Sequence, residues 1–169
     1  MSNDTQLPIE LQKLGETRFA ALYPEQKNQQ QIERLLALSD FAWRSLSSQP
    51  TLLSWLLCEH EIKNREILDP FAQLDITKIE ESECHKLLRQ YREKYWLKVA
   101  FLDLCCKNPI ENSIEYISEL ADKLIDSANQ WAYKNVAKTN GEPLDEHNNP
   151  LPLMVLGMGK LGGQELNYS

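Results

Sequence analysis

The chain has 169 residues, of which 42% are hydrophobic and 25% are charged, a composition typical of a folded globular domain rather than a disordered chain. The formal net charge of −7 argues against a large phosphate-neutralising surface, so we expect no nucleic-acid partner. No apolar run reaches the roughly 20 residues that cross a bilayer, no secretory signal opens the chain, and its four cysteines form no disulfide framework, so we expect a cytoplasmic protein with no membrane partner.

Several helices are expected in the first part of the chain. Hydrophobic periodicity predicts a helix over Ile9–Leu22. Apolar residues then recur at helical spacing from Gln29 to Leu46, and a further short helix is expected over Leu52–Ile62. Asp69 followed by Pro70 has the order of a helix N-cap and first helical position, so another helix is expected to begin there.

Two longer helices are expected in the middle of the chain. Thr77 and Glu80 have the spacing of a capping box, after which apolar residues step by threes and fours as far as Cys106. Asn108-Pro109 interrupts this pattern, and a second apolar stripe runs from Ile114 to Trp131. Two such stripes joined by a tight turn predict an antiparallel helical pair.

A polar connector rich in helix breakers begins at Asn140-Gly141-Glu142-Pro143 and runs to Pro152. We therefore expect three parts: a helical region over 1–138, a connector over 139–152, and the start of a different domain over 153–169. The predicted fold class is mainly α, with the helical N-terminal region leading into the first strand and glycine turn of an α+β domain.

The last part of the chain reads LMVLGMGKLGGQELNYS from Leu153 to Ser169. The apolar run Leu153–Leu156 predicts a strand, and the loop after it holds four of the six glycines: Gly157, Gly159, Gly162 and Gly163. Because glycine has no Cβ, backbone N–H groups in such a loop can approach a phosphate closely. The loop is therefore the candidate site.

Two familiar phosphate-binding patterns fit this loop poorly. Gly157, Gly159 and Gly162 match the G-x-G-x-x-G dinucleotide fingerprint, but the acidic residue expected about 20 positions later is missing from the sequence. The P-loop pattern fails, because Leu161 rather than Ser or Thr follows Lys160.

A third pattern fits more residues. In the nucleotidyltransferase superfamily that includes DNA polymerase β, a Gly-Gly or Gly-Ser pair meets the triphosphate, and Asp-x-Asp on the next strand holds the metal ions. Gly162-Gly163 is such a pair. Moreover, GMGKLGGQELNYS resembles the signature of the glutamine synthetase adenylyltransferase family, whose bifunctional enzyme attaches AMP to glutamine synthetase and removes it. Other stretches resemble the same family in order: Leu38-Ser39-Asp40-Phe41, Leu88–Glu93 with Val99–Leu104, and Leu120-Ala121-Asp122.

Two residues depart from the family pattern. Leu102 stands where arginine usually precedes Asp-Leu, which weakens any claim that the Asp103 region makes the usual polar contacts. Gln164 stands where arginine is common, at a position that we expect to tolerate the change.

The resemblance implies the adenylyl-removing half of the enzyme, which uses phosphate to release AMP as ADP. It places the metal-binding Asp-x-Asp directly after Ser169, so we expect no catalytic residue and no metal ligand within this sequence, which would be an N-terminal fragment inactive on its own. The implied cofactor of the complete enzyme is Mg²⁺, with ATP, ADP and phosphate as substrates. The implied partners are glutamine synthetase and a PII-type nitrogen-signalling protein. The candidate nucleotide-binding residues are Lys160, Gly162, Gly163 and Ser169.

Two other functions stay open on the sequence. The chain could be a helical protein–protein interaction module in which the glycine-rich tail is only a linker, and nucleotide binding would separate this hypothesis from the first. A Rossmann oxidoreductase would require a long helix and an acidic residue beyond Ser169.

Overall fold

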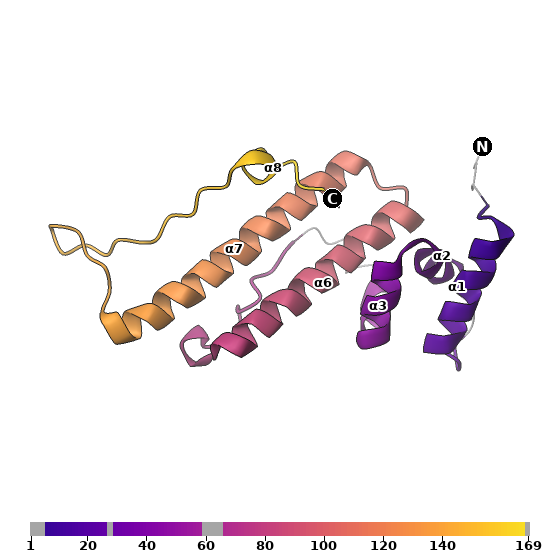
Figure 1. Ribbon diagram of the computed structural model, residues 1–169, viewed down its shortest axis with the longest axis horizontal. Coiled ribbons are helices and arrows are strands. Elements are labelled where there is room, and N and C mark those ends of the chain that lie inside the picture. The colour runs from indigo at the N-terminus through magenta and orange to yellow at the C-terminus, as the bar shows by residue number, and fades with distance from the viewer. Residues whose placement is uncertain (1–5, 27–28, 59–65, 168–169) are drawn as a thin grey trace. The chain divides into compact units, whose positions relative to one another are not determined.

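The computed structural model describes residues 6–26, 29–58 and 66–167, and these are mainly helical, as the sequence predicts (Figure 1). None of the helices in these three ranges has the length and apolar character that crossing a membrane requires. The elements are α1 (Ile9–Leu22), α2 (Gln30–Leu38), α3 (Asp40–Ser48), α4 (Leu52–Leu56), the 3-10 helix η1 (Ile76–Lys78), α6 (Glu81–Cys105), α7 (Ile110–Asn140) and α8 (Gly159–Gly162).

The strand expected over 153–156 is not formed in the described part of the chain. A strand exists only when a neighbouring strand completes its hydrogen bonds, and no described segment pairs with these residues. The single antiparallel bridge among the described residues joins Leu144 to Pro150, inside the connector.

The chain forms two compact units. The first comprises residues 1–65 and 94–113, and the second comprises residues 66–93 and 114–169. Both α6 and α7 therefore contribute residues to each unit.

The first unit is built on a close crossing of α1 and α2. A Cβ added to Gly15 would lie 2.3 Å from the backbone oxygen of Glu33, so only glycine allows this approach. The core around the crossing is apolar and fully buried. Its largest fully buried side chains are Phe19, Ile32, Leu35, Leu36, Leu46, Leu56 and Leu97.

The sequence predicted continuous helical spacing from Gln29 to Leu46, but the structure breaks it at Ser39. This residue is extended, with φ −135° and ψ 107°, and its hydroxyl accepts a hydrogen bond of 3.1 Å from the amide of Ala42. Ser39 is thus the N-cap of α3, and side-chain capping prevails over the apolar periodicity. The helix expected over Leu52–Ile62 ends as α4 at Leu56, and the end of that prediction lies outside the described residues.

The second unit contains only part of the predicted helical pair, namely residues 81–93 of α6 and residues 114–140 of α7. Trp131 of α7 packs against a small core that includes Phe71, Ile79 and Cys84, and its indole nitrogen donates to the backbone oxygen of Ile79 at 2.9 Å. Trp131 is near the end of α7, whereas Cys84 is near the start of α6, so the two helices run antiparallel, as predicted.

Two predicted helix starts are wrong. Thr77 lies in η1, where the carboxylate of Asp75 accepts hydrogen bonds from its amide and its hydroxyl, so Thr77 does not cap α6. Asp69 accepts from the amide of Phe71 at 2.9 Å, but the residues that follow form turns rather than a helix. In both places the short aspartate side chain satisfies the local backbone and stabilises a turn.

The chain reverses direction after the end of α7. Gly141 has a φ of +79°, and its amide donates to Ala137, an arrangement that terminates the helix. The carboxylate of Asp145 then accepts from the amides of His147 and Asn149, both at 2.8 Å, and closes the connector. Residues beyond the connector run alongside α7 towards α8, as Figure 1 shows.

Candidate functional site

The glycine loop forms a compact turn around α8. Gly159 has a φ of +59°, a conformation that favours glycine. A Cβ on Gly162 would lie 2.5 Å from the backbone oxygen of Gly157, so the turn itself requires glycine at position 162. Gly163 differs, because its φ is −86° and a Cβ there would lie 3.4 Å from the oxygen of Gly159, which is an ordinary contact.

The predicted nucleotide-binding residues Lys160, Gly162 and Gly163 come together in this one exposed turn, whereas Ser169 lies outside the described residues. The ammonium of Lys160 is 3.2 Å from the amide oxygen of Asn167, so the turn and the residues after it are linked.

The amides of the glycine pair take part in the turn's own hydrogen bonds. The amide of Gly163 donates to Gly159 at 2.9 Å, and that of Gly162 donates to Met158 at 3.4 Å. A further bond of 2.7 Å, from the amide of Glu165 to the oxygen of Lys160, closes the turn. A phosphate that bound these amides would therefore have to share or displace internal hydrogen bonds.

The segment leading into the turn is apolar and exposed. Met154, Leu156 and Met158 expose 78%, 77% and 84% of their surfaces. Exposed hydrophobic side chains in a row are typical of a surface that another element covers.

Three polar side chains of α7 contact the segment that holds the turn. Asp122 Oδ2 accepts a hydrogen bond of 2.7 Å from Gln164 Nε2, and Ser118 Oγ accepts one of 3.2 Å from the amide of Leu166. Asn129 Nδ2 donates to the backbone oxygen of Leu153 at 3.1 Å. Sequence reasoning missed this role, although the spacing of four and seven residues places all three on one helical face.

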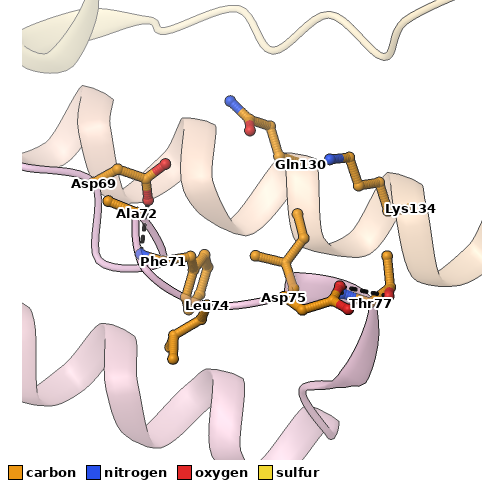
Figure 2. Close-up of a pocket in the computed structure, with 9 residues that line it drawn as sticks. Asp69, Phe71, Ala72, Leu74, Asp75, Thr77, Gln130 and Lys134 are labelled. Atoms are coloured by element: carbon orange, nitrogen blue, oxygen red, sulfur yellow. Dashed lines mark hydrogen bonds between the residues drawn. The ribbon is translucent and has the colours of Figure 1, made fainter.

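A separate depression of about 270 Å³ lies between α7 and the loop before η1, where Gln130 and Lys134 lie opposite Asp69 and Asp75 (Figure 2). Both carboxylates accept hydrogen bonds from nearby groups. Asp69 accepts from the amide of Phe71 and, at 3.1 Å, from the hydroxyl of Ser127. Hydrogen bonds from Thr77 lower the pKa of Asp75 to about 2, so this carboxylate is held in its charged form. The two aspartates stabilise the loop.

Within the described ranges, no three or more His, Cys, Asp or Glu side chains are grouped so that they could hold a metal ion.

The geometry thus defines a mainly helical protein with a glycine turn fixed on its longest helix. The family model of glutamate-ammonia ligase adenylyltransferase matches residues 29–169, and the chain belongs to this family. Similar curated proteins are each named bifunctional glutamine synthetase adenylyltransferase/adenylyl-removing enzyme. The one from Shewanella woodyi is 36% identical over 90% of the chain, that from Psychromonas ingrahamii 35% over 82%, and that from Pasteurella multocida 33% over 82%.

The chain spans only 17%, 15% and 14% of the lengths of these three relatives. The activity in their shared name is that of proteins several times longer.

Proposed function

We propose that this chain contributes the helical region and the first glycine turn of an adenylyl-removing nucleotidyltransferase that acts on glutamine synthetase. The observation that carries the proposal is the family match through residue 169, which includes the glycine turn. The turn is exposed, and Gly162 and Gly163 have no Cβ, so a phosphate can approach their amides by sharing or displacing the internal hydrogen bonds of the turn. The turn also carries Lys160 as a cation for phosphate.

The reaction proposed for the longer protein is phosphorolysis of an AMP–tyrosine bond. A phosphate oxygen attacks the phosphorus of AMP, the bond from phosphorus to the tyrosine oxygen breaks, and that oxygen takes up a proton. The products are ADP and the unmodified tyrosine. Residues Gly162 and Gly163 lie against the phosphates through their backbone, and Lys160 offsets part of the negative charge.

The finer parts of the domain are proposed on the same basis. Residues 153–156 form the first strand of an α+β nucleotidyltransferase sheet once a partner strand is present, and the exposed side chains of Met154 and Leu156 then lie on one face of that sheet. The Mg²⁺ ligands are an Asp-x-Asp directly after Ser169, and Ser169 contributes a hydroxyl to the phosphate site.

The proposed partners follow from the activity. Glutamine synthetase is the protein substrate, a PII-type protein is the nitrogen-signalling partner, and both place the chain in the cytoplasm. The three parts 1–138, 139–152 and 153–169 then correspond to a helical lead-in, a connector and the beginning of the nucleotidyltransferase domain.

Titration of ADP into the protein extended to the length of its relatives tests this function. Gly163→Val should lower ADP affinity by at least tenfold, because the added methyl groups obstruct the approach of phosphate. Gly163→Ala is the matched control for the turn, since the structure has room for one Cβ there. Unchanged affinity in Gly163→Val would favour a helical interaction module with a glycine-rich linker.

A further inference from the structure

The glycine turn is held against α7 at two points that follow it directly in the chain. Gln164, the first residue after the glycine pair, bonds to Asp122, and Leu166 bonds to Ser118. Because the two α7 residues are four apart, they present one acceptor per helical turn on the same face. Two acceptors in a row fix both the position and the direction of the segment.

The two acceptors differ in burial and in strength. Ser118 is fully buried, and its hydroxyl donates to the backbone oxygen of Ile114 at 2.9 Å, which orients its lone pairs. The same oxygen then accepts from the amide of Leu166. Asp122 is exposed, but its bond to Gln164 is short and charge-assisted.

The backbone of Gln164, the residue that contacts Asp122, has an unusual conformation. Its φ is +56°, in the left-handed region that non-glycine residues rarely adopt. Such a conformation persists only when surrounding contacts enforce it. The amide of Gln164 donates to Leu161 and its side chain donates to Asp122, so the residue is held from both ends.

We propose that Asp122 and Ser118 are positioning residues, which set the orientation of the glycine turn and the direction in which the chain leaves it. This inference rests on the proposed function, because the orientation matters only if the turn holds phosphate and the next segment carries the reacting groups. The α7 residues act through Gln164 and Leu166 and do not touch the substrate.

The contact itself is tested by hydrogen exchange on the 169-residue chain. Asp122→Ala and Ser118→Ala should each lower the protection of the Leu166 amide by about tenfold, as loss of a hydrogen bond of this kind implies. Asp126→Ala is the matched control, since Asp126 is an exposed α7 carboxylate that accepts from Gln130 instead. Unchanged protection in both test variants overturns the proposal.

The positioning role is tested in the longer protein by phosphorolysis of adenylylated glutamine synthetase. Asp122→Ala should lower kcat by about tenfold or more while KM for the protein substrate stays the same, because the docking of that substrate is not altered. Asp122→Arg should have the same effect, and adding Gln164→Glu should restore both protection and kcat by reversing the pair. Asp126→Ala should behave like the unaltered protein.

The outcomes separate this inference from the proposed function. Lost protection with unchanged kcat would overturn the positioning role while leaving the enzyme assignment intact. A longer protein without any phosphorolysis would refute the proposed function and the positioning role with it, whereas the exchange data would still report the contact of the turn with α7.

Discussion

Substitution by alanine should destabilise the glycine turn at Gly162 and stabilise it at the neighbouring Gly163. Gly162→Ala places a Cβ 2.5 Å from the backbone oxygen of Gly157, roughly 0.9 Å inside an ordinary contact of 3.4 Å. That oxygen belongs to the chain backbone and cannot rotate away. Gly163→Ala places its Cβ at 3.4 Å from the nearest atom, with a φ of −86° that alanine adopts freely.

The expected magnitudes follow from these distances. Overpacking against backbone costs about 2 kcal/mol, so Gly162→Ala should increase opening of the turn by roughly 30-fold. Gly163→Ala should stabilise the closed turn by about 0.4–1 kcal/mol, because alanine has fewer unfolded conformations to lose, which decreases opening about two- to fivefold.

Hydrogen exchange of the Glu165 amide measures this opening, since its bond of 2.7 Å to Lys160 closes the turn. Global stability, followed by thermal unfolding, serves as the control that each variant remains folded. Equal exchange rates in Gly162→Ala and Gly163→Ala would refute the steric distinction between the two glycines.

Three further predictions concern the first unit. Gly15→Ala should destabilise it by roughly 2–3 kcal/mol in urea unfolding, because the new Cβ would lie 2.3 Å from the Glu33 oxygen, and unchanged stability would contradict the close crossing. Burial raises the pKa of the Glu33 carboxyl above 4.5, and the negative charge of Glu16 raises it further, so the fold becomes less stable as Glu33 ionises with rising pH. Glu33→Gln should therefore raise thermal stability at pH 7, and this gain should vanish below about pH 4.5. A gain of the same size at every pH would contradict the raised pKa. Burial raises the pKa of the Cys105 thiol to about 12, so little reactive thiolate forms there at pH 8. Iodoacetamide at pH 8 should therefore label the exposed Cys58 first, as followed by mass spectrometry. Early labelling of Cys105 would contradict this prediction.

The helical architecture could be predicted from the sequence where the signal is local and long. The apolar stripes of α6 and α7 repeat over many turns, so their periodicity outweighs local interruptions. Ser39 was missed because it lies within a continuing apolar pattern, where only the capping bond to Ala42 shows the break. Thr77 was expected to cap the helix because Thr77 and Glu80 have the spacing of a capping box, whereas in the structure the Thr77 amide donates to Asp75 and Thr77 lies in η1.

The glycine turn itself could be predicted from the sequence, whereas its surroundings could not. The four glycines in residues 157–163 predict a turn, and the structure contains that turn around α8. The different roles of Gly162 and Gly163 depend on a distance to Gly157 that no spacing rule provides. The contacts of Ser118 and Asp122 join residues more than 40 positions apart, and a helical pattern does not say which segment covers its polar face.

We propose that this chain begins a phosphorolytic, adenylyl-removing domain. The decisive experiment is to incubate the protein, extended to the length of its relatives, with adenylylated glutamine synthetase and labelled inorganic phosphate. We expect phosphate-dependent loss of AMP from the substrate, with one labelled ADP formed for each AMP removed. Release of free AMP without incorporation of phosphate, or no release at all, would contradict the account.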